Sequence, residues 1–194
     1  MFIVFEGPDG SGKTTLAQAF TEHLCNKGID ALYTFEPTSD GVYGQQIREL
    51  LRSNRACDPV VLSDLLTADR GDHLTRTILP ALSSGKWVIC DRYKYSALAY
   101  QQVQGVDAAY LIESNSNYQY PDIVFILRPK SVDTLLDRMQ HRGTQAELFE
   151  KRDFLTQTLK LYSKMPSYFP NEVIHFLDAE CAISELIQRI DACI

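Results

Sequence analysis

A glycine-rich stretch near the start of the chain has the residue types and the spacing that bind phosphate. Residues 7–14 read G-x-x-x-x-G-K-T, a loop whose backbone N–H groups surround a phosphate group. In such a loop Lys13 places its charge on the β- and γ-phosphates of a nucleoside triphosphate, and Thr14 offers its hydroxyl to Mg²⁺. The loop also contains a carboxylate, Asp9, which phosphate binding alone does not require. The residues expected to hold the triphosphate are Gly7, Gly10, Ser11, Gly12, Lys13, Thr14 and Thr15.

A second stretch whose residue types could bind phosphate or metal is "DRYKYSALAYQ", residues 91–101. Asp91 closes an apolar run, where its carboxylate suits a magnesium or water ligand beside the loop. Arg92 offers a planar fork of donors to phosphate oxygens. An Asp-Arg pair alone is a weak signal, because surface ion pairs are common. In the same chain as the glycine-rich loop, it indicates a site for phosphate groups.

The composition limits the class of protein. A chain of 194 residues is long enough for one well-buried core, so we expect a single domain. With 45% hydrophobic and 23% charged residues, it has the composition of an ordinary globular protein. Its formal net charge of -6 argues against a nucleic-acid polymer as partner, because proteins that bind phosphate backbones are usually basic.

The cysteines and the apolar runs indicate the cellular environment of the protein. The cysteines are odd in number and contain no C-x-x-C, which favours a reduced, cytoplasmic environment without a zinc site. No apolar run approaches the roughly 18 residues of a membrane span. The opening "MFIVFEG" lacks the length and the basic start of a signal peptide. We therefore expect small-molecule partners and no membrane partner.

Strands and helices alternate along the chain. Short apolar runs such as "FIVFE" predict buried strands, and apolar residues at helical spacing, such as Leu16, Phe20 and Leu24, predict helices. Asp58 before Pro59 is typical of a helix start, and Gly28 of a helix end. The predicted strands are 2–6, 29–35, 86–90, 122–128 and 172–177. The predicted helices follow the loop up to Gly28 and then cover 43–52, 59–82, 95–104, 107–114, 131–139, 151–165 and 182–192.

This alternation predicts an α/β fold, with a parallel five-stranded sheet and helices on both faces. Ligands of such sheets lie beyond the carboxyl ends of the strands. Three marked stretches fall at such ends: the glycine-rich loop, "EPT" at 36–38 and "DRY" at 91–93. We expect the three stretches to converge on one cleft.

The chain resembles thymidylate kinases, the P-loop enzymes that phosphorylate dTMP with ATP. The matching stretches are "FIVFEGPDGSGKTT", "EPT" with "GQQIRELL", "LLTADRGDHL", "DRYKYSALAYQ", "QYPDIVFIL" and "HFLDAE". They span nearly the whole chain in the family's order, and D-R-Y-x-x-S-x-x-A-Y-Q is the most specific. The resemblance implies Mg²⁺-dependent transfer of the ATP γ-phosphoryl group to dTMP, giving dTDP and ADP. It also implies one P-loop kinase domain over residues 1–194, and a homodimer in which long helices such as 59–82 pair.

The resemblance gives the loop carboxylate a role. In this family the residue that matches Asp9 faces the acceptor and contacts the 3′-hydroxyl of the nucleoside monophosphate, and it also influences magnesium. A carboxylate aimed away from the loop amides accepts a hydrogen bond from a sugar hydroxyl at modest cost. The alternative is that Asp9 only caps a turn.

Three arginines of this chain match the positions of arginines that bind substrate in the family. Arg92 is expected to hold the acceptor phosphate and the transferring group, and Arg48 to reach the acceptor phosphate. Arg70 is expected to donate to a carbonyl of the base. The alternatives are a solvated helix arginine for Arg48, and for Arg70 an ion pair with the nearby Asp69 or Asp72.

The sugar and the base have further expected contacts. Tyr100 and Gln101 match residues that lie against them, and a tyrosine ring at the 2′ position leaves little room for a ribose hydroxyl. Ser96 belongs to the same set, although Ser96 and Tyr100 also suit core helix positions. Glu36 is expected to orient an arginine or a water. Leu66 stands where most members of the family have a phenylalanine that stacks on thymine.

Phosphoryl transfer needs a dry site, so a lid is expected. Residues 138–152, "RMQHRGTQAELFEKR", are the polar stretch best suited to close over ATP. Some family members have a basic residue in the loop at the position of Ser11, and this chain does not. The lid is therefore expected to supply the arginines, Arg142 first and Arg138 second, for ATP binding and catalysis. The alternative is a solvated charged face.

Two other functions fit parts of the sequence. A kinase of the same fold that acts on another deoxynucleotide, such as dUMP, is the nearer alternative. A nucleotide-hydrolysing switch is the more distant one, because "NKGID" at 26–30 resembles the guanine-reading Asn-Lys-x-Asp. The aspartate of this stretch comes one residue too late, and a turn at Gly28 explains it.

Overall fold

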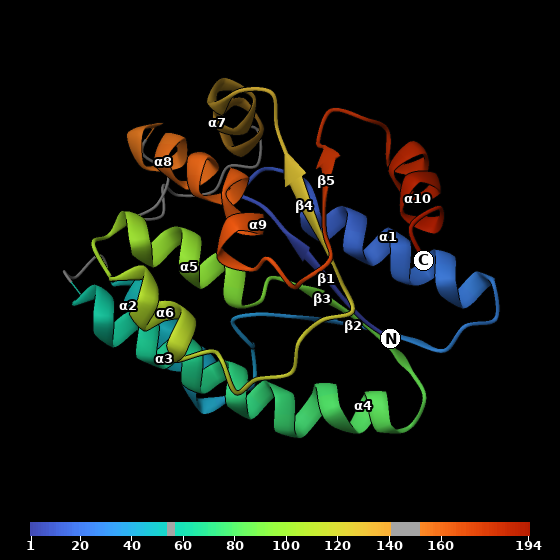
Figure 1. Cartoon of the computed structure of the whole chain (residues 1–194), viewed down its shortest axis with the longest axis horizontal. Coiled ribbons are helices and arrows are strands. Elements are labelled where there is room, and N and C mark those ends of the chain that lie inside the picture. Colours follow the sequence, from blue (N-terminus) through green and yellow to red (C-terminus); the bar gives the residue numbers. More distant parts are fainter. Residues whose placement is uncertain (54–56, 141–151) are drawn as a thin grey trace.

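The computed structural model describes residues 1–53, 57–140 and 152–194. Strands and helices alternate along them as the sequence predicts (Figure 1). The strands are β1 (Phe2–Glu6), β2 (Ala31–Phe35), β3 (Trp87–Asp91), β4 (Ile123–Arg128) and β5 (Ile174–Asp178). The helices are α1 (Lys13–Asn26), α2 (Val42–Arg52), α3 (Pro59–His73), α4 (Leu79–Ser83), α5 (Lys94–Val103), α6 (Ala108–Glu113), α7 (Val132–Gln140), α8 (Arg152–Ser163), α9 (Met165–Tyr168) and α10 (Ile183–Asp191).

Within the described residues, the strands form a five-stranded sheet in the order β2-β3-β1-β4-β5. Every neighbouring pair is parallel, which confirms the predicted α/β fold. β1 lies at the centre, and all its residues are buried. A strand covered by helices on both faces has no polar face, and therefore "FIVFE" shows no alternation of polar and apolar residues.

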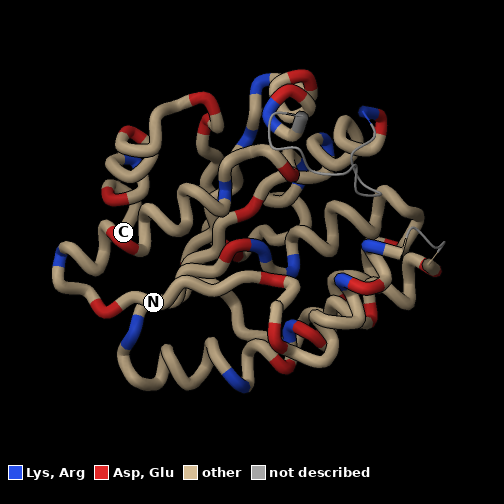
Figure 2. The backbone as a smooth tube through the Cα atoms, turned by 180° about the vertical axis from the view of Figure 1, so that it is seen from behind, with Lys and Arg blue, Asp and Glu red and all other residues tan. Residues whose placement is uncertain are grey.

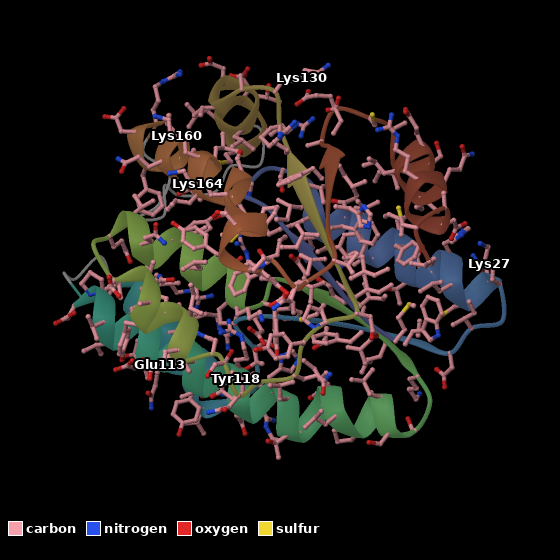
Figure 3. All side chains as sticks on the ribbon, in the orientation of Figure 1. Lys27, Glu113, Tyr118, Lys130, Lys160 and Lys164 are labelled. Carbon is pink, nitrogen blue, oxygen red and sulfur yellow. The ribbon has the colours of Figure 1, made fainter. Side chains whose placement is uncertain are left out.

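Alternate side chains of β1 enter two different apolar cores. Phe2 and Val4 pack with apolar residues of α3, α5 and α8 on one face of the sheet. Ile3 and Phe5 pack with α1 and α10 on the other face. Figure 1 shows α1 and α10 together on one side of the sheet, and side chains fill both faces in Figure 3.

Two helix ends that the sequence predicts are confirmed. The side chain of Asp58 accepts a hydrogen bond from the Val60 N–H at 2.8 Å, and Pro59 occupies the first turn of α3. At the end of α1, Gly28 has a φ of +81°. The N–H of Ile29 donates to the Leu24 carbonyl at 3.0 Å, which closes the helix in a Schellman motif.

The helix expected over 59–82 is not regular. After α3, residues Leu74–Ile78 form a π-helical turn, and α4 follows. Pro80 lies in the first turn of α4, and its missing N–H removes a hydrogen bond from a regular helix. The N–H of Leu79 reaches the carbonyl of Leu74, five residues back. The prediction of one regular helix was therefore wrong across this turn.

The helix expected over 151–165 is also divided. α8 ends at Ser163, and Pro166 lies in the first turn of the short helix α9. At that position the missing N–H of proline has no partner to lose. The proline therefore begins a new helix, where we had expected it only to end the previous one.

Basic and acidic residues are interspersed along the backbone (Figure 2), in a chain whose formal net charge is -6. Among the described helices, none combines the length with the apolar character that crossing a membrane requires.

Candidate active site

The carboxyl ends of β1, β2 and β3 lie side by side, because β3 pairs with both of the other strands. The hydroxyl of Thr14, at the start of α1, donates to the carboxylate of Asp91 at the end of β3. The Glu36 N–H, just beyond β2, donates to the Asp91 carbonyl oxygen at 3.0 Å. The guanidinium of Arg92 pairs with Asp9 in the loop after β1. The predicted convergence of the three stretches is thus confirmed.

The loop between β1 and α1 has a backbone that requires glycine. Gly7 has a φ of +139°, and a Cβ there would lie 2.7 Å from the carbonyl oxygen of Leu127. Gly10 and Gly12 also have positive φ, +80° and +92°. α1 begins at Lys13 without a side-chain cap. The first-turn N–H groups of this helix are therefore open to an anion.

Lys13 lies folded across the loop. Its Nζ is 3.4 Å from the carbonyl oxygen of Pro8 and 3.3 Å from Oδ1 of Asp9. The side chain is 7% exposed. Burial, together with the nearby charge of Arg92, lowers the pKa of the ammonium group. A buried cation with such long contacts gains from a stronger anionic partner, such as a phosphate.

Thr14 and Asp91 provide the oxygen atoms that a hydrated magnesium ion prefers. The Thr14 hydroxyl donates to Oδ2 of Asp91. Oδ1 of Asp91 is buried and has no hydrogen-bond partner among the described residues. A buried carboxylate oxygen without a partner is costly, so this pair fits a cation or its bound water. Ser11 is buried in the same loop, and Thr15 is exposed beside Thr14.

Asp9 connects the loop to α5. Its Oδ1 accepts from Nη2 of Arg92, and its Oδ2 lies 3.3 Å from the Tyr100 hydroxyl. Burial opposes ionisation of Asp9, but the charges of Arg92 and Lys13 outweigh it and hold the pKa of the carboxyl well below its usual value. Nη1 of Arg92 donates to Ser96 Oγ at 2.8 Å. Asp9 is thus the anion that two cations share in this structure.

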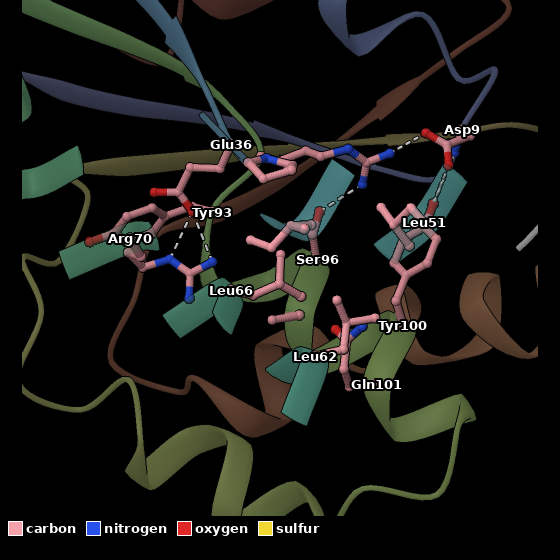
Figure 4. A pocket seen from close by; sticks show the side chains of 14 residues that line it. Asp9, Glu36, Leu51, Leu62, Leu66, Arg70, Tyr93, Ser96, Tyr100 and Gln101 are labelled. Atoms are coloured by element: carbon pink, nitrogen blue, oxygen red, sulfur yellow. Dashed lines mark hydrogen bonds and ion pairs between the residues drawn. The ribbon is translucent and has the colours of Figure 1, made fainter. Parts of the chain in front are cut away.

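A cavity of about 150 Å³ opens beside Asp9 and Arg92. Figure 4 shows Asp9 and Arg70 on opposite sides of it, with Leu62 and Leu66 between them. The aliphatic part of the wall consists of Pro37, Ile47, Leu51, Leu62, Leu66 and Ala97. Gln101 also lines the cavity, and its buried carbonyl oxygen has no partner among the described residues. The cavity therefore offers an apolar slot with polar groups at its ends.

Arg70 is held at its end of the cavity by buried partners. Its Nε and Nη2 donate to Oε2 of Glu36 at 2.9 and 2.8 Å. Its Nη1 donates to Asn115, and the guanidinium lies 5.0 Å from the ring centroid of Tyr93. Glu36 also contacts Nδ1 of His73 at 3.2 Å. Glu36 thus orients an arginine, which was one of its two expected roles. The ion-pair partner of Arg70 is Glu36 and not Asp69 or Asp72, the partners that the alternative interpretation of Arg70 had named.

The structure does not bring every predicted residue to the cavity. Arg48 donates to the carbonyl oxygens of Thr38 and Ser39 and does not line the cavity. Arg138 lies against the loop instead, with Nη1 3.5 Å from the Gly10 carbonyl oxygen. Its Nη2 is 3.1 Å from the carbonyl oxygen of Ala179. Arg142 lies outside the described residues.

Some residues of the site escaped the sequence analysis. Asn115 holds Arg70 from a position 45 residues away in the chain, and no local pattern marks it. Asp69 is buried and accepts from the N–H and the hydroxyl of Thr38, at 2.8 and 2.6 Å, which fixes the loop after β2. Glu6 did carry a signal, because it is a carboxylate at the end of an otherwise apolar buried strand.

A parallel sheet with a G-x-x-x-x-G-K-T loop after its central strand, and with the hydroxyl of Thr14 bonded to Asp91 beside that loop, defines a P-loop nucleotide-binding protein. Comparison with known proteins narrows this class. The family model for thymidylate kinase matches residues 5–190.

Individual relatives agree with the family model. A probable thymidylate kinase of Pyrococcus horikoshii is 41% identical over 174 residues, which cover 87% of this chain and 84% of that protein. A thymidylate kinase of Brachyspira hyodysenteriae is 36% identical over 178 residues, covering 91% of this chain and 84% of the relative. A probable thymidylate kinase of Methanocaldococcus jannaschii is 41% identical over 165 residues, covering 85% and 81%. The chain belongs to the thymidylate kinase family.

Proposed function

We propose that this protein transfers the γ-phosphoryl group of ATP to dTMP, with Mg²⁺, and releases dTDP and ADP. Family membership supports the reaction. The observation that carries it is the position of the cavity, which begins at Asp9 and Arg92 beside the phosphate-binding loop and ends at Arg70. A nucleoside monophosphate in this cavity has its base at Arg70 and its phosphate facing the loop.

The donor side consists of the loop and the start of α1. The loop N–H groups and Lys13 hold the ATP phosphates, and Thr14 with Asp91 holds the metal. When bound, Mg²⁺ neutralises charge on the phosphates. Arg138 lies close enough to the loop to serve the nucleotide. We assign the lid to residues 138–152 and its catalytic arginine to Arg142.

The acceptor side consists of α3, α5 and the loop after β2. Arg92 holds the acceptor phosphate, and Asp9 accepts from the 3′-hydroxyl. Arg70 donates to a carbonyl of the base. The carbonyl oxygen of Gln101 has no hydrogen-bond partner in the part of the chain that the structure describes, and it suits the N–H that a thymine ring presents. Tyr100 and Ser96 lie on the sugar and phosphate side, and Leu66 covers the ring.

In the proposed reaction the protein forms no covalent bond with either nucleotide and acts through its charges. In this structure Lys13 and Arg92 both contact Asp9. When nucleotides bind, phosphate oxygens replace Asp9 as the partners of Lys13 and Arg92, and the Asp9 carboxylate can then accept a hydrogen bond from the sugar hydroxyl. Two anions can then approach each other, because fixed positive groups offset their repulsion. In a dry site such compensation is the main source of rate enhancement. Arg48 reaches the phosphate only after it leaves the carbonyls of Thr38 and Ser39.

One observation favours a second acceptor. Tyr93 and Tyr100 also line the cavity, but position 66 carries an aliphatic side chain, which covers a pyrimidine without the stacking that an aromatic ring at that position provides. We therefore include dUMP, or another pyrimidine deoxynucleotide, as an alternative acceptor. A switch protein receives no such support, since the "NKGID" stretch forms the Schellman end of α1.

We also propose that residues 1–194 act as one kinase domain that forms a cytoplasmic homodimer. Apolar side chains on α3 and α4 remain exposed in the single chain, namely Val60, Val61 and Leu79 at 42%, 50% and 41%. Helices that pair across a two-fold axis bury such residues.

An acceptor screen tests the proposed function. ADP formation from ATP and Mg²⁺ is measured with each deoxynucleoside monophosphate in turn, and without any acceptor. We expect the highest kcat/KM with dTMP and a weaker reaction with dUMP. Equal ADP formation without an acceptor indicates a hydrolase. A preference for a purine monophosphate contradicts the assignment of the cavity.

A further inference from the structure

Glu6, the last residue of β1, is a carboxylate in the middle of the protein. Its side chain is 0% exposed. Oε1 accepts from the N–H groups of Tyr93 and Ser96 at 2.8 and 3.1 Å. Oε2 accepts from the hydroxyls of Ser96 and Tyr162 at 2.6 and 3.0 Å. Four donors converge on two oxygens, which is the full capacity of an ionised carboxylate.

Oε1 of Glu6 caps α5 from outside the helix. Tyr93, the residue before α5, makes no side-chain cap of its own. The carboxylate satisfies two N–H groups at the start of this helix and places a negative charge at its positive end. α5 carries Ser96, Tyr100 and Gln101, all of which line the cavity. The register of these side chains therefore depends on a residue of the central strand.

Oε2 of Glu6 controls the proton of the Ser96 hydroxyl. A serine hydroxyl has one proton to donate and lone pairs to accept with. Because the Ser96 proton goes to Glu6 at 2.6 Å, a lone pair is left to accept from Nη1 of Arg92 at 2.8 Å. An arginine has no acceptor, so a Ser96 proton turned toward Arg92 breaks this contact. Glu6 thus acts on Arg92 through Ser96.

Arg92 needs such support. It has a φ of +73°, the left-handed conformation that a non-glycine residue rarely adopts. Strained residues of this kind persist when their surroundings fix them on several sides. Arg92 is fixed by its N–H, which donates to the Phe5 carbonyl oxygen at 2.9 Å, by Asp9 and by Ser96. Asp9 is the partner that we expect to leave when nucleotide binds, and Ser96 then remains.

We propose that Glu6 is a positioning residue for the acceptor phosphate, because its carboxylate holds the Ser96 hydroxyl in the orientation that aims Arg92. This inference rests on the proposed function in one respect, the assignment of Arg92 to the acceptor phosphate. It adds a role for a residue that contacts neither nucleotide.

Glu6→Gln tests the proposal with little change of shape. An amide keeps one oxygen for the two N–H groups and places a donor where Oε2 stood. The Ser96 proton then loses its carboxylate acceptor at 2.6 Å, and the Tyr162 hydroxyl at 3.0 Å is the weaker acceptor that remains. We expect KM for dTMP to rise about tenfold, the order expected when a hydrogen bond to a charged group is lost. KM for ATP is expected to stay unchanged, because the donor side does not involve Ser96. A purely structural role predicts a lower melting temperature without this split.

A double-mutant cycle shows whether Glu6 acts through Ser96. If it does, Glu6→Gln combined with Ser96→Ala lowers kcat/KM for dTMP no further than the stronger single change. Tyr162→Phe is the control, because it removes a hydroxyl that lies 3.0 Å from both Glu6 Oε2 and Ser96 Oγ, while the Glu6 carboxylate still accepts the Ser96 proton. We expect this control to lower the melting temperature and to change KM for dTMP by less than about twofold. Fully additive losses in the cycle, or equal KM changes in Tyr162→Phe and Glu6→Gln, overturn the proposal.

Two further measurements separate the possible failures. If the unaltered protein phosphorylates no monophosphate, the proposed function fails, and the crystal structures of the unaltered and Glu6→Gln proteins still test the geometry. Arg92 Nη1 within hydrogen-bond distance of Ser96 Oγ in both structures contradicts the proposal. If Glu6→Gln does not fold, Ser96→Ala alone must raise KM for dTMP while leaving KM for ATP unchanged. A normal KM for dTMP in that variant also overturns it.

Discussion

Lys13 has weak partners for a buried cation, which is why its removal is expected to affect catalysis more than folding. Its contacts with Pro8 and Asp9 are 3.4 and 3.3 Å long. Lys13→Ala is expected to lower kcat by about 100-fold or more, because one fixed donor to the developing charge is lost. Steady-state ADP formation and a thermal melt of the same preparation check this.

Lys27→Ala is the control, since Lys27 lies at the far end of α1 and pairs with Asp191 (Figure 3). It should turn over normally. Normal turnover in a pure preparation of Lys13→Ala contradicts the assignment of the phosphate-binding loop.

Leu66 lines the cavity among other aliphatic side chains. An aromatic ring at this position adds stacking worth about 0.5–1.5 kcal/mol, which corresponds to a few-fold up to roughly tenfold in affinity. Leu66→Phe is therefore expected to tighten dTMP binding by that factor and to increase the preference for dTMP over dUMP. Calorimetric titration with both nucleotides measures the change.

Leu65→Phe provides the matched control, because Leu65 is a partly buried neighbour on α3 that does not line the cavity. If Leu66→Phe binds dTMP no better than the unaltered protein, the ring does not lie against residue 66.

At the scale of the element, α3 carries Leu66 and Arg70 and begins with a side-chain cap. Asp58→Ala removes the acceptor of the Val60 N–H and is expected to lower the free energy of unfolding by about 1 kcal/mol. Urea unfolding measures the loss. KM for dTMP should not change, because Leu66 and Arg70 lie more than two turns further along α3, and only Leu62 of the cavity wall lies near the cap.

Asp58→Asn keeps a capping oxygen and should recover most of the stability. An equal loss in Asp58→Asn and Asp58→Ala means that charge near the helix start matters and the cap hydrogen bond does not.

The elements were predictable because their signals are local. "FIVFE" is a continuous apolar run, Asp58 precedes Pro59, and Gly28 ends α1, and each structure formed where the pattern placed it. The π-helical turn was not predicted, because a proline such as Pro80 can either end a helix or follow a π-helical turn within it, and the sequence does not distinguish the two. The end of each strand is also marked by a local pattern. Because the strands are parallel, their carboxyl ends meet at one edge of the sheet, and this brings together the loops after β1, β2 and β3.

The interior of the site depends on contacts that no local pattern contains. Ser96 reaches Glu6 across 90 residues of chain, and Arg70 reaches Asn115 across 45. The loop motif and "DRY" located the site, whereas the partners of Arg70 and Arg92 required the folded chain. The role of Arg48 stays a prediction from its positional match, because in this structure its guanidinium donates to carbonyl oxygens of the loop after β2.

At the scale of the whole molecule, the exposed apolar residues of α3 and α4 suggest a test of assembly. The unaltered protein is expected to sediment as a dimer. Val61→Lys places a charge on an apolar side chain that is 50% exposed, and burying an unpaired charge opposes association. Sedimentation velocity at equal protein concentrations should therefore show a monomer for this variant.

Val173→Lys is the matched control, since Val173 is 51% exposed just before β5. It should leave the dimer intact. A dimer that persists in Val61→Lys places the interface elsewhere.

Asp9 has a consequence for the selectivity of the molecule as a whole. The Asp9 carboxylate already forms ion pairs with Lys13 and Arg92. Free orthophosphate must therefore compete for these cations with a side chain that is part of the site. A tethered group has a high effective concentration, so small inorganic anions displace it poorly. In the proposed binding mode a nucleotide brings a sugar hydroxyl that gives Asp9 a new partner and a base that fills the cavity, so we expect it to meet less competition. We therefore expect inorganic phosphate to inhibit the protein only weakly, while nucleotides bind.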